Sequence, residues 1–260
     1  MCVDSASGEG RFLFVEPDRF DGAGTVTIDG EDHHHLCHVL RVRPGQPLVL
    51  LDGRGSAFCA HVSAVSRASL TARIHGPAAC PPEPAVAITV AQAIGRGGRF
   101  EEALEHATEA GASAFVPLAC ARAVVRLTDH EAERKGARWR MVVKGAAEQA
   151  RRSRPPHVAP AAGIEAVARS GSTYALALAA DPRGEPIAAV LPPEPPPTAI
   201  VVVGPEGGLA AEEIDALVEA GFRVVSLGPF VLRTETAAVI AVCQMLFRYA
   251  GATGDKTGSR

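Results

Sequence analysis

The sequence predicts an α/β protein with two regions of different periodicity. Short alternating runs separated by turn residues fill residues 11–75, which is typical of a small β-barrel or sandwich. The proline-rich stretch 80–84 then interrupts regular structure. Beyond it, apolar strand-like runs alternate with helical segments, which predicts a largely parallel sheet covered by helices on both faces. We therefore expect one domain over residues 1–80, a second over 84–250 and a disordered tail over 251–260.

The first region is expected to hold five strands and one helix. The strands are predicted from alternating or β-branched runs at 11–15, 24–28, 47–51, 57–65 and 69–74. The helix is predicted over 32–42, because Leu36, Val39 and Leu40 share one side at helical spacing. Asp32 is the residue expected to cap its N-terminus.

The second region is expected to alternate between strand and helix along most of its length. Its strands are predicted at 85–91, 114–118, 174–178, 199–203 and 222–226. Its helices are predicted at 99–110, 130–151, 210–220 and 235–249, and Gly111 and Gly221 end two of them. The proline-rich segment 192–197 is expected to be a stiff surface loop.

Composition excludes several classes of protein. Hydrophobic residues make up 47% of the 260-residue chain and charged residues 21%, as in ordinary globular proteins. No run approaches the roughly 18 apolar residues of a membrane span, and the N-terminus lacks a signal-peptide pattern. The six cysteines form no Cys-x-x-Cys pair, so we expect reduced thiols and a cytoplasmic protein.

Charge is distributed unevenly along the chain. The net charge of −3 gives no global indication of nucleic-acid binding. Arginines nevertheless cluster in residues 41–43, 96–99 and 151–154, and local basic clusters can bind phosphates. Solvated surface arginines are the alternative for any one cluster taken alone.

Two glycine-containing loops, each between a strand and a helix, are the strongest functional indications. The first spans 204–208 with the sequence Gly-Pro-Glu-Gly-Gly, and the second spans 227–237. Open α/β sheets bind ligands where strands end in such turns. The glycine spacing fits neither a dinucleotide turn nor a Walker A loop, which disfavours phosphate binding. Glycine still lets a flat ligand approach the backbone closely, while a purely structural turn is the alternative.

Arg233 is the residue of the second loop that helix capping does not explain. Thr234 can cap the following helix, and Glu235 suits its first turn. A cation is unfavourable near a helix N-terminus unless an anionic partner or ligand lies nearby. We therefore expect Arg233 to contact a ligand.

Two other chemistries have little support. In the histidine run 33–38, His34 and His38 are four residues apart, but no acidic or cysteine ligand lies nearby at a recognised spacing except Cys37, which would point elsewhere on a helix. Surface or packing histidines are therefore favoured, and no metal is expected. A G-x-S-x-G motif is absent from the sequence, which argues against acyl hydrolysis.

Taken in order, these motifs resemble those of the RsmE family, whose members use S-adenosylmethionine to methylate N3 of one uridine in 16S ribosomal RNA. The resemblance covers about residues 11–249. It rests on residues 32–41 with Gly45, 99–111 with Pro117 and Arg122, 148–154, 204–208 and 227–237. The sequence departs from the family at Ala150-Arg151, where Cys-Gly is usual, at Phe230, where an arginine is usual, and at His106, where a lysine is common.

The resemblance implies a fold and a set of partners. It implies a PUA-like β-barrel domain at the N-terminus and a SPOUT-type α/β domain with a C-terminal trefoil knot. It further implies S-adenosyl-L-methionine as the cofactor, a homodimer, and 16S ribosomal RNA in the small ribosomal subunit as the partner, with no membrane association. Another SPOUT enzyme acting on the ribose 2′-oxygen, or a non-catalytic RNA-binding assembly factor, are the alternatives.

The resemblance also assigns residues to roles. Arg233 is the predicted catalytic residue, since a guanidinium could stabilise the charge that reaches the uracil carbonyl oxygens when N3 loses its proton. Glu206 and Glu235 are candidates for the general base. The predicted cofactor-binding residues are Leu178, Val203, Gly204, Pro205, Glu206, Gly207, Gly208, Leu227, Gly228, Leu232, Thr234, Glu235, Thr236 and Ala237. The predicted RNA-binding residues are Arg11, His34, Arg41, Arg43, Arg96, Arg99, Arg122, Arg152 and Arg154.

Overall fold

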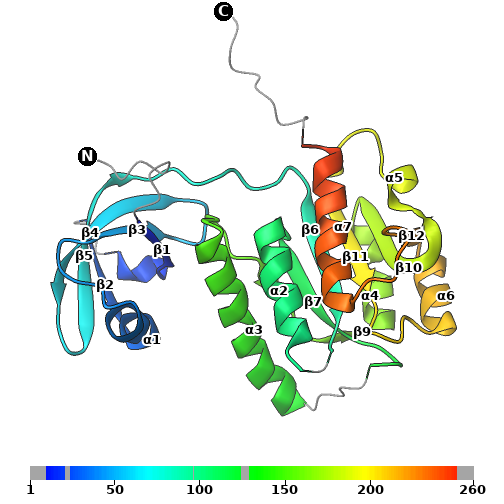
Figure 1. Ribbon diagram of the computed structural model, residues 1–260, viewed down its shortest axis with the longest axis horizontal. Coiled ribbons are helices and arrows are strands. Elements are labelled where there is room, and N and C mark those ends of the chain that lie inside the picture. The colour runs from blue at the N-terminus through cyan, green and yellow to red at the C-terminus, as the bar shows by residue number, and fades with distance from the viewer. Residues whose placement is uncertain (1–9, 21–23, 96, 124–128, 251–260) are drawn as a thin grey trace, which may run out of the picture. The chain divides into compact units, whose positions relative to one another are not determined.

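The computed structural model describes residues 10–20, 24–95, 97–123 and 129–250 (Figure 1). The chain divides into two compact units, one of residues 1–83 with 147–155 and the other of residues 84–146 with 156–260. The division after Glu83 falls in the proline-rich stretch where the sequence pattern changes. The inclusion of residues 147–155 in the first unit has no counterpart in that pattern. The expected tail 251–260, Arg96 and Cys2 lie outside the described residues.

The first unit is built on one five-stranded sheet in the order β1-β3-β4-β5-β2. The strands are β1 (Arg11–Phe14), β2 (Thr25–Asp29), β3 (Pro47–Leu51), β4 (Ala57–Val65) and β5 (Ser69–Pro77). β1 runs parallel to β3, and the other pairs are antiparallel. Side chains that alternate along these strands, such as Leu48 and Leu50, fill a core with Leu36.

The helix expected over 32–42 begins earlier and changes type. It consists of α1 (Gly30–His34) followed by a π-helical turn, η2 (His35–Val39), in which the amide of Leu40 donates to the carbonyl of His35. Asp29, not Asp32, occupies the N-cap position. The wider π turn alters the angular spacing of side chains, so Leu36 is buried whereas Val39 is 60% exposed. The expected shared apolar side is therefore wrong for Val39.

The second unit is built on a seven-stranded sheet in which every described strand pair is parallel. Its order is β12-β10-β11-β6-β7-β8, with β9 also paired to β7. The strands are β6 (Ala87–Ala93), β7 (Ala114–Ala119), β8 (His157–Val158), β9 (Ala162–Gly163), β10 (Leu176–Pro186), β11 (Thr198–Val203) and β12 (Arg223–Ser226). The helices are α2 (Arg99–Ala110), α3 (Asp129–Gln149), α4 (Ile164–Ser170), α5 (Ile187–Val190), α6 (Ala211–Glu219) and α7 (Thr234–Arg248).

Helices cover both faces of this sheet, as the alternation of strand and helix predicts. On one face α2 and α7 lie side by side (Figure 1) and pack on Val201 of β11. On the other face α4 and α6 pack on its neighbours Ile200 and Val202. Successive strand residues point to opposite faces, which explains why the whole run 199–203 is apolar.

Several elements differ from expectation. The helix expected to reach residue 151 ends at Gln149, and Arg151 has a positive φ of 58°. β10 continues to Pro186, well beyond the strand expected at 174–178, and β8, β9, α4 and α5 were not expected.

Cys37, Cys59, Cys80, Cys120 and Cys243 are free thiols. Among the described residues, no helix combines the length and apolarity needed to cross a membrane. The trefoil knot stays a prediction.

Candidate functional site

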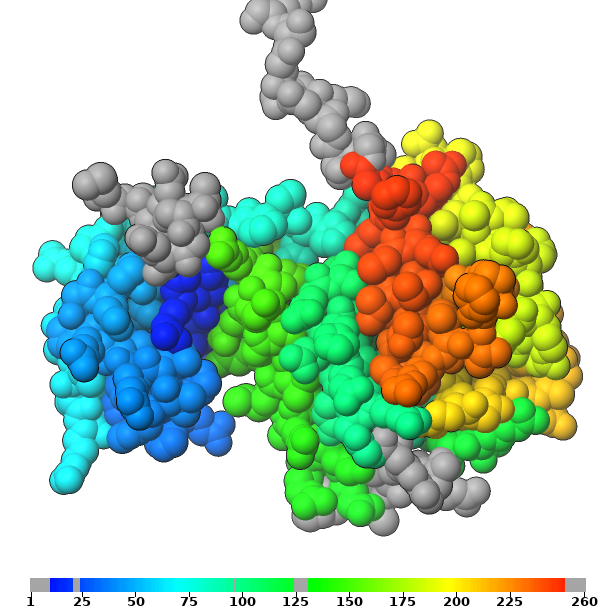
Figure 2. Space-filling model, in the orientation of Figure 1, coloured from blue at the N-terminus to red at the C-terminus, as the bar shows by residue number. Residues whose placement is uncertain are grey.

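A cavity of about 660 Å³ lies in the second unit where β11 and β12 end. Because carboxyl ends of parallel strands meet at one edge of a sheet, the two glycine-containing loops converge there. The lining residues come from 180–183, 203–209, 226–228 and 230–234, with Arg122, Ala211 and Ala237. In Figure 2 the loop before α7, in orange, stands at the surface beside the red helix.

The turn after β11 requires its glycines. A side chain at Gly204 would place its Cβ 3.0 Å from the amide nitrogen of Leu209. Gly208 has a positive φ of 69° and donates its N–H to the carbonyl of Pro205 at 2.8 Å. Both positions therefore favour glycine, and the turn presents bare backbone to the cavity.

The two loops are fastened to each other by the hydroxyl of Thr234. It donates to the carbonyl oxygen of Gly204 at 2.7 Å and accepts a hydrogen bond from Nε2 of Gln92 at 2.7 Å. Gln92 lies at the end of β6 and is 1% exposed. Thr234 was expected to cap α7, but the N-cap position belongs to Arg233 and carries no side-chain capping bond. The threonine hydroxyl serves the turn instead.

Two arginines hold the same turn from outside. Arg99, at the start of α2, forms an ion pair with Glu206 at 2.7 Å. Arg122, in the loop after β7, donates from Nη1 to the carbonyl oxygens of Gly207 at 3.0 Å and Leu209 at 3.3 Å. These contacts involve two of the residues predicted to bind RNA.

Glu213 was not predicted as a site residue, yet it anchors the loop that carries Arg122. One carboxylate oxygen accepts from the amide of Ala210 at the start of α6, and the other accepts from the amide of Ala121, both at 2.7 Å. Cys120 lies next to this loop, and burial, with the nearby Glu213 charge, raises the pKa of its thiol to about 12. Only the spacing of Glu213 in a capping box could have indicated its local role.

Asp181 and Arg183 form a second group that sequence reasoning missed. Asp181 is 8% exposed, and both of its carboxylate oxygens accept hydrogen bonds from the Arg183 side chain at 2.9 and 3.0 Å. These bonds hold the pKa of Asp181 below its usual value. Both residues line the cavity from β10. The turn-like sequence Asp-Pro-Arg-Gly at 181–184 is the signal that could have pointed to this part of the site.

The predicted cofactor residues divide into two groups. Leu178, Glu235 and Thr236 do not line the cavity, whereas the others do. Leu178 is fully buried in the core, and Thr236 is exposed. Glu235 is 9% exposed, and its Oε2 atom has no hydrogen-bond partner among the described residues. Arg233 lines the cavity and is exposed to solvent.

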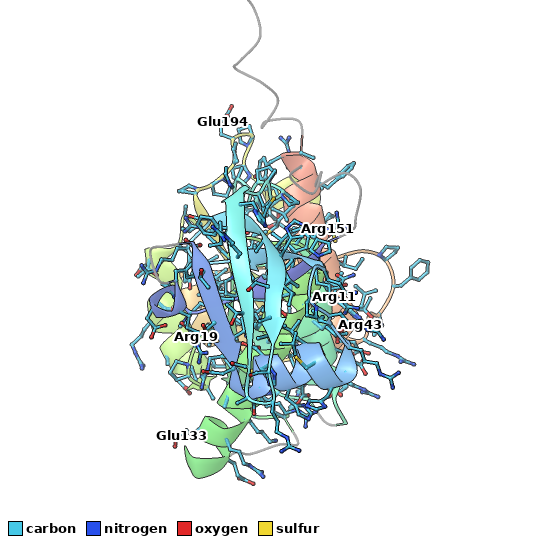
Figure 3. All side chains as sticks on the ribbon, turned by 90° about the vertical axis from the view of Figure 1, so that its left-hand side faces the viewer. Arg11, Arg19, Arg43, Glu133, Arg151 and Glu194 are labelled. Carbon is cyan, nitrogen blue, oxygen red and sulfur yellow. The ribbon has the colours of Figure 1, made fainter. Side chains whose placement is uncertain are left out.

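The predicted RNA-binding residues of the first unit are mostly on its surface. Figure 3 shows Arg11 and Arg43 toward one side of this unit and Arg19 toward the other. The members of the predicted set that are exposed in this unit are Arg11, His34, Arg41, Arg43 and Arg154.

Arg152 differs from them. Its side chain is 9% exposed and its Nε donates to Glu83 at 3.2 Å, which leaves little surface for a phosphate.

The histidine run does not form a metal centre within the part of the chain that is described. The rings of His34 and His38 stack with centroids 4.7 Å apart, and buried His33 lies 3.2 Å from the carbonyl of Ser66. No group of three or more ligating side chains converges among the described residues.

Comparison with known proteins connects this geometry to RNA methylation. A family described as the RNA methyltransferase domain matches residues 81–246, and one described as the RNA methyltransferase PUA domain matches residues 28–74. The chain is 39% identical to the ribosomal RNA small subunit methyltransferase E of Mycobacterium bovis over 234 residues, which cover 85% of this chain and 86% of that protein.

Two solved structures with bound S-adenosylmethionine are similar to this one. The ribosomal RNA small subunit methyltransferase E of Neisseria gonorrhoeae superposes with a TM-score of 0.82 at 30% identity, over 91% of this chain and 96% of that one. A Legionella pneumophila protein superposes with a TM-score of 0.84 at 29% identity, over the same shares of the two chains. The similarity therefore extends over both units.

Proposed function

Because the chain belongs to the ribosomal RNA small subunit methyltransferase E family, we propose that it methylates N3 of a specific uridine in 16S ribosomal RNA. It is an S-adenosylmethionine-dependent ribosomal RNA methyltransferase. We further propose that the methylated atom is N3 of one specific uridine. We also propose that the reaction takes place in the cytoplasm, on the RNA of the small ribosomal subunit. The observation that carries it is the cavity where the two glycine-containing loops converge beside Arg233.

The cavity fits the cofactor. About 660 Å³ accommodates a nucleoside joined to an amino acid, and ligand sites of this kind commonly measure 300–1,000 Å³. Val203, Leu227 and Leu232 supply apolar walls, and the bare backbone of residues 204–208 lets a flat ring approach closely. We propose that these loops hold S-adenosylmethionine, which supplies an electrophilic methyl group when bound.

Arg233 is the proposed catalytic residue. Attack by N3 requires loss of its proton, which spreads negative charge onto the uracil carbonyl oxygens. A guanidinium aimed at those oxygens stabilises that charge, and the positive end of the α7 dipole adds to the effect. Arg233 is an exposed cation at the cavity and occupies the N-cap position of α7.

Neither carboxylate candidate is proposed as the general base. Glu206 is ion-paired with Arg99, and Glu235 lies outside the cavity lining. The N3 proton would then leave to solvent water, and the chain's contribution to the chemical step is the alignment of N3 and the stabilisation of its anion.

The exposed cations of the first unit are the proposed RNA surface. A paired uridine hides N3, so the target base must be unpaired or extruded before reaction. Phosphate contacts by Arg11, Arg41, Arg43 and Arg154 would hold the flanking RNA, and such contacts weaken steeply with salt.

We also propose a homodimer and a trefoil knot. Phe230 and Val231 are 80% and 87% exposed, and Phe247 of α7 is 84% exposed, so apolar side chains stand in water along the last loop and helix. Burial of such side chains favours association. The knot is proposed because the chain belongs to this family of RNA methyltransferases.

Mass spectrometry of 16S RNA tests the proposed reaction. After incubation with the protein and S-adenosylmethionine, nucleoside digests should contain 3-methyluridine. A methyl group on ribose instead would favour a 2′-oxygen enzyme. Absence of S-adenosylmethionine binding in calorimetry would favour a non-catalytic assembly factor, which need not bind the cofactor. Absence of 3-methyluridine on both naked RNA and small subunits would overturn the proposal.

A further inference from the structure

Arg122 holds the turn beside the cavity although it belongs to a different strand–helix connection. Its Nη1 donates to the carbonyl oxygens of Gly207 and Leu209. The carboxylate of Glu213 fixes the loop that carries it, through the amide of Ala121. Arg99 reinforces the same turn through Glu206. The turn is therefore held by protein side chains before any ligand binds.

The other edge of the Arg122 guanidinium is not used in the same way. A guanidinium has five N–H donors in a planar fork. The carbonyl oxygens of Gly207 and Leu209 accept hydrogen bonds from Nη1 of this fork. No hydrogen bond joins its Nε or Nη2 donors to an acceptor in the described residues, and the side chain is exposed. The pair formed by Nε and Nη2 is the edge that binds phosphate with two parallel hydrogen bonds.

We propose that Arg122 couples RNA binding to the cofactor turn, with one edge on the carbonyls of Gly207 and Leu209 and the other on an RNA phosphate. This inference rests on the proposed function and adds a link between its two ligands. A phosphate that fixes the guanidinium also reduces the freedom of the turn, so S-adenosylmethionine binds more tightly when RNA is present. By thermodynamic reciprocity, RNA then binds more tightly when the cofactor is present.

Two simpler roles make different predictions. An arginine that only stabilises the turn would change cofactor affinity but leave its dependence on RNA intact. An arginine that only contacts RNA would leave cofactor affinity in the absence of RNA unchanged. Arg122 as a coupling residue changes both quantities.

Calorimetry of S-adenosylmethionine binding separates these roles. The RNA probe is a single-stranded oligonucleotide of adenosine and cytidine, which offers phosphates but no uridine, so no methyl transfer occurs. In the unmodified protein the probe should tighten cofactor binding several-fold. Without the probe, Arg122→Ala should weaken cofactor binding roughly tenfold, because two hydrogen bonds to the turn are lost. The probe should then produce no tightening.

Two further variants sharpen the experiment. Arg122→Lys keeps the charge but replaces the planar fork with a single ammonium, so cofactor affinity should be partly restored without the response to RNA. Arg169→Ala is the control, because it removes the same charge from exposed α4, away from the cavity lining. Both quantities should stay at the values of the unmodified protein. Thermal unfolding of each variant checks that it is folded.

Three results would overturn the coupling role: unchanged cofactor affinity of Arg122→Ala without RNA, a preserved response of that variant to the probe, or no response in the unmodified protein. Failure of the proposed function is a separate outcome. It would appear in the unmodified protein as absent cofactor binding or absent 3-methyluridine.

Discussion

The hydroxyl of Thr234, the first residue of α7, donates to the carbonyl oxygen of Gly204, 30 residues earlier in the chain and 2.7 Å away. Because Thr234 also accepts from Gln92, one hydroxyl connects the ends of β6 and β11 with the start of α7. Removal of this hydroxyl takes one partner from each of two groups in the interior, although Nε2 of Gln92 keeps its bond to the carbonyl of Ala93. This single side chain therefore ties the two cofactor loops to each other.

Thr234→Val should destabilise the protein by about 1–3 kcal/mol, since the carbonyl of Gly204 and one N–H of the Gln92 amide would each lose a hydrogen bond without a change in shape. Cofactor binding should weaken as the loops separate. Urea unfolding and calorimetry measure the two effects. Thr236→Val, two residues along the helix but exposed, is the stability control and should stay within about 0.5 kcal/mol. Equal stabilities of the two variants would contradict the anchoring role.

Arg152→Ala should act on the stability of the first unit rather than on RNA binding. Arg152 is buried against Glu83, and loss of one partner leaves the other charge poorly solvated, at a cost of about 3–5 kcal/mol. Denaturant unfolding measures this loss.

Exposed Arg154 is the contrasting position. Arg154→Ala should leave stability unchanged but weaken RNA binding and reduce its salt dependence. If Arg154→Ala lost stability and Arg152→Ala lost RNA affinity instead, Arg152 would be the RNA contact and Arg154 the structural residue.

Asp181 should contribute stability that depends on pH. Hydrogen bonds from Arg183 lower the pKa of Asp181 in the folded state. Its stabilising effect is therefore complete above the ordinary aspartate pKa of about 3.9 and is lost as pH falls through the lower folded value. The difference in unfolding free energy between the unmodified protein and Asp181→Asn should be constant from about pH 7 to pH 5 and shrink below about pH 4. Glu194→Gln, at an exposed position, is the control for the change in net charge. If the difference in unfolding free energy between the unmodified protein and Asp181→Asn grew on acidification, the stabilising role of the Asp181 carboxylate would be refuted.

The sequence predicted those parts of the fold whose pattern is local. The sequence predicted the strands β6, β7, β11 and β12 from their apolar runs, because strands buried on both faces are apolar throughout. It predicted α2 and α6 from apolar residues at helical spacing, because these helices bury one face. The third strand was expected to end at residue 178, whereas β10 continues through the turn-like residues Asp181-Pro-Arg-Gly184. The structure extends it through a register shift against β12 after Ala180.

Contacts between residues that are far apart in the sequence could not be predicted from the local pattern of apolar and polar residues. Residues 147–155 belong to the first unit because Ala147 packs in its core and the side chain of Glu148 accepts from the amide of Phe14, 134 residues earlier. Gln92 and Thr234, which meet over the cavity turn, are 142 residues apart. The loops could thus be located from their glycines, but not the side chains that hold them.

Arg233→Ala should lower the rate of methyl transfer by about 10²–10³-fold, the usual effect of removing a donor that stabilises a developing oxyanion. Its affinity for S-adenosylmethionine should change little, because the guanidinium is proposed to face the uracil and not the cofactor. Single-turnover kinetics and calorimetry measure the two quantities. Arg248→Ala, at the exposed far end of the same helix, is the control for charge.

The pH dependence of the Arg233→Ala variant gives the sharper test. If the guanidinium serves to stabilise the anion formed when N3 loses its proton, alkaline solution should replace part of its effect by deprotonating the uridine directly. The rate of Arg233→Ala should then rise more steeply with pH than that of the unmodified protein, while Arg233→Lys, which keeps a cation, should fall between them. Parallel profiles would mean that Arg233 only positions the RNA, because a positioning defect slows the neutral and the ionised base alike.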